Sequence, residues 1–186
     1  MDTIIEKGNN GLFENEIELQ GIYAKHLRIL KEEIGVFDTA REGYLTSVIL
    51  GCLHKDYKKI NKDVAADDIK PLSIFGSDLV LRKSDLRYLY RVIMLWDETG
   101  DISVDDYMNR AFRDDSDTNR RDYLKNNMAI FNKYAMIGVE YLYDIFYECR
   151  NTDEVCDIVN AKTNKFYLKY NELDDKELPD FNPKFD

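Results

Sequence analysis

The stretch YLKNNMAIFNKYAMIGVEYLYDIFY, residues 123–147, carries the strongest helical pattern in the chain. Its apolar residues recur at steps of three and four, which is the period of one helix face: Leu124, Met128, Phe131, Ala135, Gly138, Leu142 and Ile145. A second row is also apolar or aromatic: Ile130, Tyr134, Ile137 and Tyr141. A helix that is apolar on most sides has to be surrounded by protein. We therefore expect a central buried helix over about residues 120–148.

Small residues within this stretch predict a close helix contact. Ala135 and Gly138 would let a neighbouring backbone approach the central helix. Gly138 costs roughly 1 kcal/mol of helix propensity relative to alanine. The cost is understandable if the fold gains packing at this position.

Helical signals also precede the central helix. An apolar stripe over residues 14–34 predicts one helix, and Gly35 stands where a left-handed C-terminal cap is expected. Thr39 and Glu42 have the capping-box spacing and predict the start of a second helix.

A third helix is expected to begin near Ser77 or Ser84 and to stop at Gly100. Its apolar positions are Leu86, Leu89, Val92, Ile93 and Trp96. Ser103 predicts the cap of a short helix through Met108 and Phe112, and Thr152 the cap of a last helix. Together these elements predict an all-α fold, a single-domain bundle of about five to six helices around the central helix.

Three segments are expected to differ from the helical domain, which we place at residues 14–170. Residues 1–13 are predicted to be a flexible lead-in, since they contain Gly8, Asn9, Asn10 and Gly11. Residues 58–77 form a long connection, in which residues 72–75 are expected to anchor on the bundle, with a short strand as one option. Residues 171–186 are predicted to be an acidic tail that is either disordered or strapped across the surface.

Composition excludes several classes of protein. A length of 186 residues suits one domain, and a net charge of −10 argues against a free-standing nucleic-acid binder, because phosphates would repel the protein. The apolar runs are shorter than the roughly 20 residues of a membrane span. The N-terminus lacks a signal-peptide layout, and three cysteines are too few for a disulfide framework. We therefore expect a cytoplasmic protein without a cofactor, a membrane contact or a direct nucleic-acid contact.

The candidates for catalysis or metal binding are weak. Cys52 and His54 are two residues apart, so they point to different faces of a helix. His26 lies on another predicted helix, and Cys149 and Cys156 do not have the spacing of known zinc ligands. No phosphate loop, serine elbow or metalloprotease helix signature is present. We expect neither an enzyme nor a metal protein, and keep a small enzyme using Cys52 or His54 as an alternative.

Asp115, Asp117 and Asn119 imitate the opening of a calcium loop. However, Arg120 stands where the loop needs glycine, and Asn126 stands where it needs a bidentate glutamate. We interpret these acids as the favourable start of a helix.

Two groups of residues are candidates for binding a partner. Lys83, Arg87 and Arg91 are four apart and predict a basic line along the third helix, which would hold an acidic surface or pair with the protein's own acids. Tyrosine combines a large apolar body with a polar tip, which favours protein interfaces. The tyrosines that we single out are Tyr88, Tyr143 and Tyr147.

Three stretches together resemble a known family. They are FDTAREGYLTSVILG (residues 37–51), IMLWDETGD (residues 93–101) and IFNKYAMIGVEYL (residues 130–142). In order and spacing they are similar to small helical accessory proteins encoded beside bacterial DNA phosphorothioation and related phage-defence genes. The shared motifs are core-packing motifs, and residues 58–82 do not fit the family pattern.

The resemblance implies a non-catalytic partner of larger ATPase or nuclease subunits in a bacterial antiviral defence complex. It supplies no catalytic residues. Our prediction is an accessory subunit that binds a larger protein, with assembly of several copies left open. The alternative is a phage-type acidic inhibitor that imitates the charge of DNA.

Overall fold

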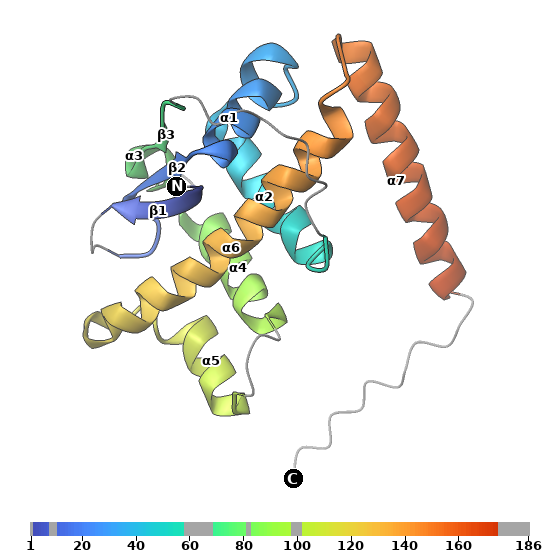
Figure 1. Ribbon diagram of the computed structural model, residues 1–186. Helices are drawn as coiled ribbons and strands as arrows, with labels where there is room; N and C mark the ends of the chain where they lie inside the picture. Colours follow the sequence, from blue (N-terminus) through green and yellow to red (C-terminus); the bar gives the residue numbers. More distant parts are fainter. Residues whose placement is uncertain (1, 8–10, 58–68, 81–82, 98–101, 175–186) are drawn as a thin grey trace.

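The computed structural model describes residues 2–7, 11–57, 69–80, 83–97 and 102–174 (Figure 1). They form a mainly helical fold with one small antiparallel sheet. The elements are β1 (Thr3–Lys7), β2 (Glu16–Gln20), α1 (Ile22–Arg28), the π-helical turn η1 (Ile29–Glu33), α2 (Ala40–Leu53), β3 (Leu72–Ile74), α3 (Gly76–Val80), α4 (Lys83–Trp96), α5 (Val104–Phe112), the 3₁₀ turn η2 (Thr118–Arg120), α6 (Arg121–Phe146) and α7 (Thr152–Asp174). The all-α prediction is therefore right for most of the chain and wrong for three short strands.

The sheet has the order β1-β2-β3, with both pairs antiparallel. Its middle strand lies within residues 14–34, where we expected helix throughout. In β2 the side chains of Ile17 and Leu19 are fully buried, and residues two apart share one face of a strand, so the apolar period is two rather than 3.6. Gly21, with φ of 59°, then turns the chain from the strand into α1.

The segment predicted as a lead-in contributes to the core. Residues 3–7 form β1, with Ile4 paired to Leu19, and both Leu12 and Phe13 are buried. The Gly-Asn run that motivated our expectation joins two strands instead of leading into the first helix. Residues 8–10 themselves lie outside the described residues.

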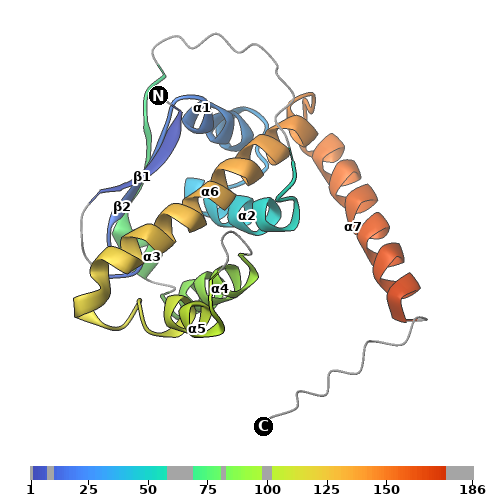
Figure 2. The same ribbon diagram turned by 60° about the horizontal axis from the view of Figure 1, so that its bottom comes forward.

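The central helix is confirmed as α6, which crosses the molecule and packs against α2 and β1 (Figures 1 and 2). A methyl group built on Gly138 of α6 would lie 1.8 Å from the Ser47 carbonyl oxygen of α2. One built on Gly51 of α2 would lie 1.9 Å from the Tyr134 carbonyl oxygen of α6. The two backbones thus touch through a reciprocal pair of glycines, as the sequence predicts for Gly138.

Of the helix caps predicted from the sequence, one is confirmed and one is shifted by a residue. Thr39 and Glu42 form the capping box at the start of α2. At α7, however, the backbone N–H of Glu154 donates to the side chain of Asn151, so Asn151 and not Thr152 is the cap. Asparagine accepts from the second or third helical N–H as readily as threonine does.

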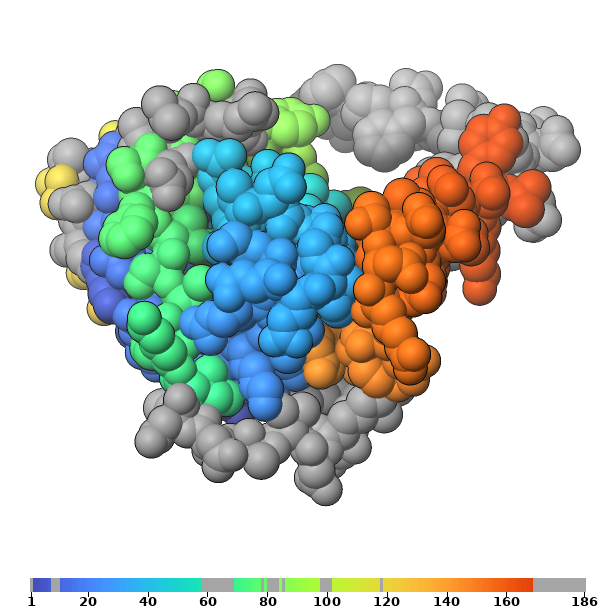
Figure 3. All heavy atoms as spheres, turned by 90° about the horizontal axis from the view of Figure 1, so that it is seen from above, coloured from blue at the N-terminus to red at the C-terminus, as the bar shows by residue number. Residues whose placement is uncertain are grey.

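Helix α7 projects from one edge of the body (Figures 1 and 3). Residues 171–174 of the predicted tail belong to this helix, and the rest of that tail lies outside the described residues. Residues 58–68 of the predicted connection and the expected helix stop at Gly100 also lie outside the described residues. The short strand considered for this connection is confirmed as β3. Within the described ranges no helix is long and apolar enough to cross a membrane.

Candidate protein-docking surface

Helices α4 and α5 pack beside each other on the side of α6 opposite to α1 (Figure 2). The inner face of this pair is buried: Leu86, Tyr90, Ile93, Met94 and Ala111. These residues account for the amphipathic pattern that predicts the third helix.

The outer face of the same two helices is apolar as well. On α4 the exposed residues are Tyr88, Val92, Leu95 and Trp96, at helical steps of four, three and one. On α5 they are Val104, Met108 and Phe112, at steps of four. Residues at steps of three and four share one face of a helix. We call these seven residues the α4–α5 surface.

The exposure of these side chains is large. Tyr88 is 72% exposed, Trp96 53% and Val104 78%. The Arg91 guanidinium carbon of α4 lies 5.3 Å from the centre of the Phe112 ring of α5, so the two helices are in contact beside the rows. Aromatic residues and methionine are enriched at protein interfaces, and rows of exposed apolar residues mark interaction sites.

A buried carboxylate fixes α4 and α5 to the central helix. Asp97, fully buried at the end of α4, accepts a hydrogen bond of 2.7 Å from Tyr134 Oη of α6. It also accepts one of 2.9 Å from Arg110 Nη1 of α5. A buried charge needs such partners, so Asp97 orients three helices at once.

A second buried carboxylate, that of Asp114, joins the end of α5 to the start of α6. Asp114 accepts from Arg120 Nε at 2.5 Å and from Asn127 Nδ2 at 2.9 Å. Asn127 Nδ2 also donates to Tyr90 Oη, which in turn donates to the Arg110 carbonyl oxygen. Burial raises the pKa of Tyr90 well above its ordinary value, so this hydroxyl stays protonated and available as a donor. These buried hydrogen bonds hold α4 and α5, and with them the exposed apolar rows, in a fixed position on α6.

The predicted basic line turns inward where the structure describes it. Arg87 Nε lies 2.9 Å and Arg91 Nη2 3.5 Å from Asp115 Oδ2, and the Asp115 side chain is fully buried. Lys83 is the first residue of α4, and its side chain lies outside the described part of the chain. This inward pairing is the second of the two interpretations that the sequence allows.

The three candidate tyrosines lie in two places. Tyr88 belongs to the α4–α5 surface. Tyr143 and Tyr147 lie near the other end of α6, with ring centres 5.8 Å apart. Tyr143 is half-buried and stacks on His26 at 3.6 Å. The structure thus does not bring the three tyrosines together.

The remaining chemical candidates are dispersed. Cys52 is buried, and burial raises the pKa of its thiol to about 11, whereas His54 is exposed and stacks on Tyr141. His26 is buried, with Nδ1 at 3.2 Å from Glu140 Oε1. No cluster of three metal-ligating side chains occurs among the described residues.

The calcium-loop imitation has a structural explanation. The Asp117 side chain accepts from the Asn119 backbone N–H at 2.9 Å and so caps η2. Asp115 faces Arg87 and Arg91. These two acids thus serve a turn and an ion pair.

Most of the α4–α5 surface is not predicted by the sequence, because Val92 and Trp96 fit the apolar stripe of the third helix. A signal was present: the apolar residues of α4 occupy two sides of the helix, and one flanking core can cover only one of them. Val104 and Met108 gave no such signal on so short a helix.

Comparisons of the chain with models of known protein families, with curated proteins and with solved structures found no match.

Proposed function

We propose that the protein is a non-catalytic accessory subunit that binds a larger protein through the α4–α5 surface. The observation that carries the proposal is the pair of exposed apolar rows on α4 and α5. Burying such side chains against a partner is favourable by roughly 25 cal/mol per Å² of apolar area. The buried contacts of Asp97 and Asp114 support it further, because a rigid surface loses less entropy on binding.

The proposed partner offers an apolar surface of its own. Arg87 and Arg91 are paired with the buried Asp115, so the charge of neither arginine needs an acidic or phosphate-bearing partner. The resemblance of the core motifs is our reason for seeking this partner among ATPase or nuclease subunits of a bacterial antiviral defence complex. That setting is part of the proposal.

The two alternatives have less support. An inhibitor that imitates DNA needs rows of exposed carboxylates, and four of the 36 acids, Asp97, Asp114, Asp115 and Glu140, are removed from such rows because their side chains are buried against cationic or imidazole groups. It would leave the apolar rows unexplained. An enzyme using Cys52 or His54 would need them together, and one is buried while the other is exposed.

Site-directed photo-crosslinking in the native host tests the proposal. Benzoyl-phenylalanine would replace Tyr88 on α4 or Met108 on α5, and Tyr167 on α7 serves as the control because it is 63% exposed. We expect one identified protein to be linked from the first two positions and not from the third. Equal yields of that product from all three positions, or its absence from the first two, would refute the proposal.

A further inference from the structure

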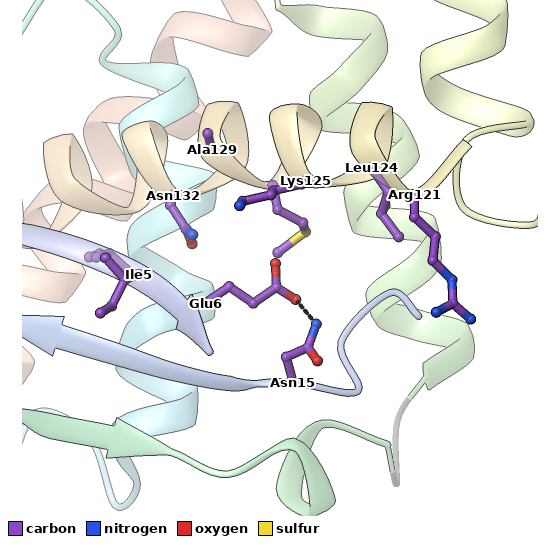
Figure 4. A pocket seen from close by; sticks show the side chains of 10 residues that line it. Ile5, Glu6, Asn15, Arg121, Leu124, Lys125, Ala129 and Asn132 are labelled. Carbon is purple, nitrogen blue, oxygen red and sulfur yellow. Dashed lines mark hydrogen bonds between the residues drawn. The ribbon is translucent and has the colours of Figure 1, made fainter. Parts of the chain in front are cut away.

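A pocket between β1 and the first half of α6 shares no lining residue with the α4–α5 surface (Figure 4). Its volume is about 350 Å³, at the lower end of the range of small-molecule sites. Leu124 and Met128 of α6 form an apolar side. Glu6 of β1 and Asn132 of α6 supply polar groups. An apolar pocket with a few polar groups is the usual form of a ligand site.

Glu6 occupies a position of the sheet that otherwise carries apolar residues. It follows Ile4 by two residues and is paired with Ile17 across the ladder of β1 and β2, so these three side chains share one face of the sheet. Ile4 and Ile17 are both buried. A carboxyl on such a face costs free energy unless a partner compensates it. Glutamate at this position is therefore understandable if a ligand with N–H donors binds there.

Asn15 holds the Glu6 carboxyl in place without neutralising it. Asn15, which is 4% exposed, donates from Nδ2 to Glu6 Oε1 at 2.7 Å. Burial raises the pKa of Glu6, as expected for a carboxyl whose ionised form has lost water. An ammonium group of a ligand would favour the ionised carboxylate and restore the lost interactions.

The donors of the pocket lie on the opposite wall, along α6. Asn132 is 4% exposed, and its Oδ1 accepts from Tyr44 Oη at 2.6 Å, so Nδ2 is the donor end of the amide. Lys125 precedes Asn132 by about two turns of α6, and its side chain extends towards the Asn132 end of the pocket (Figure 4). Lys125 is exposed, so its ammonium group stands at the mouth. An amide N–H and an ammonium group at one end of a pocket suit a carboxylate.

We propose that this pocket binds a free α-amino acid with a large apolar side chain. The α-ammonium group meets Glu6 and the α-carboxylate meets Asn132 and Lys125, so the two walls contact opposite charges of one zwitterion. The side chain lies against Leu124 and Met128. Because a thioether makes favourable contacts with aromatic rings, phenylalanine is the probe of choice.

Calorimetric titration of the full chain with L-phenylalanine and three analogues tests each contact. N-acetyl-L-phenylalanine lacks the ammonium group, L-phenylalaninamide lacks the carboxylate, and L-alanine lacks the large side chain. The first two are expected to bind at least about tenfold more weakly than L-phenylalanine, because a site that hydrogen-bonds a group rejects analogues without it. L-alanine is expected to bind more weakly still, since it buries less apolar area.

Variants assign the two charged ends of the ligand to the two walls. Glu6→Gln keeps the shape of the side chain and is expected to weaken binding of L-phenylalanine by about tenfold, with no change for N-acetyl-L-phenylalanine. Lys125→Met is expected to weaken binding of L-phenylalanine by about threefold, the modest effect of an exposed charge, with no change for L-phenylalaninamide. The matched control is Lys133→Met, at another exposed lysine of α6 outside this pocket, which leaves all affinities unchanged.

Three results would overturn the proposal. The first is the absence of L-phenylalanine binding at millimolar concentration to a chain whose circular dichroism shows it folded. The second is unchanged binding of L-phenylalanine by a folded Glu6→Gln variant. The third is equal binding of L-phenylalanine and L-phenylalaninamide, which would identify a site for amines that does not recognise the carboxylate.

Discussion

Asp97 shows at the scale of one residue how the fold positions its surface. Its carboxylate is fully buried, yet it accepts from Tyr134 and Arg110 on two different helices. Removing one partner of such a group leaves the other charge without compensation in the interior. The stability of the α4–α5 pair should therefore depend on this single side chain.

We predict that Asp97→Ala lowers the free energy of unfolding by about 3 kcal/mol, the lower end of the cost of breaking a buried ion pair. The measurement is the midpoint of urea unfolding at unchanged slope. Asp105→Ala, at an exposed position in the first turn of α5, is the control and should cost less than about 1 kcal/mol. Similar costs at the two positions would contradict the assigned role of Asp97.

The raised pKa of Glu6 leads us to predict that the stability of the protein depends on pH. Burial raises its folded-state pKa above the ordinary value of 4.5, so the folded state holds the proton in a pH range where the unfolded state has lost it. The contribution of Glu6 to the free energy of unfolding is fully present below pH 4.5. It is lost as the pH rises through the folded-state pKa, because the unfolded state then gains more from ionising. Glu6→Gln removes this loss, so the variant should gain stability relative to the wild type between pH 4 and pH 7.

The check on Glu6 is urea unfolding of both proteins at the two pH values. Glu33→Gln, at an exposed position in η1, serves as the control. A Glu6→Gln variant whose relative stability is the same at pH 4 and pH 7 would show that burial does not perturb this carboxyl.

Cys52 and Cys156 differ in their predicted reactivity. Burial raises the pKa of Cys52 to about 11, whereas Cys156 is exposed on α7. Because the thiolate is the reactive form, iodoacetamide at pH 8 should modify Cys156 in the folded protein and Cys52 only after unfolding. Mass spectrometry of peptides after a timed reaction reports both. Fast modification of Cys52 in the folded chain would contradict its burial.

At the scale of elements, the contact between α2 and α6 is the central packing feature. Gly51 and Gly138 each face a carbonyl oxygen of the other helix, at distances that leave no space for a methyl group. The helices must separate if either glycine gains a side chain. This separation would also disturb Tyr134, and through it Asp97.

Gly138→Ala is therefore expected to destabilise the protein by about 2 kcal/mol, although alanine is the better helix former by about 1 kcal/mol. Asn126→Ala, on an exposed position of the same helix, should stabilise it by a few tenths of a kcal/mol at most. Both values follow from urea unfolding. A stabilised Gly138→Ala variant would mean that helix propensity outweighs the contact.

The same elements show what could be predicted from the sequence. The 3.6-residue period over residues 123–147 is sustained for many turns, so α6 and the tight approach at Gly138 were predictable. The strand β2 is five residues long, and its apolar residues fit the start of a helical stripe as well as a strand. Strand pairing with β1 and β3 decides between them, and that is tertiary information.

The binding residues were less predictable than the fold. Tyr88 was named from its residue type, but Val92, Trp96 and Val104 look like core residues until the packing of α4 and α5 is known. The pocket between β1 and the first half of α6 was not predicted, because its lining residues Glu6 and Asn132 are far apart in sequence and are brought to one pocket by the packing of β1 on α6 (Figure 4). Arg87 and Arg91 had a visible pattern whose inward direction the sequence left open.

At the scale of the whole molecule, the two longest groups of exposed apolar residues within the described ranges lie on different helices. One is the α4–α5 surface. The other is on helix α7, which projects from the body in Figure 3 and whose residues Val159, Phe166, Tyr167 and Leu168 are exposed. The first rests on buried hydrogen bonds to the central helix through Asp97, so we propose docking there. The second provides a control with comparable apolar content.

The most direct test is the dissociation constant of the complex with the partner identified by crosslinking. It would be measured for the wild type, for Val92→Ser with Trp96→Ser on α4, and for Val159→Ser with Phe166→Ser on α7. The account predicts about a hundredfold weaker binding for the α4 pair, since buried aromatic anchors dominate interfaces, and no change for the α7 pair. Unchanged binding by the α4 pair, together with loss in the α7 pair, would contradict it.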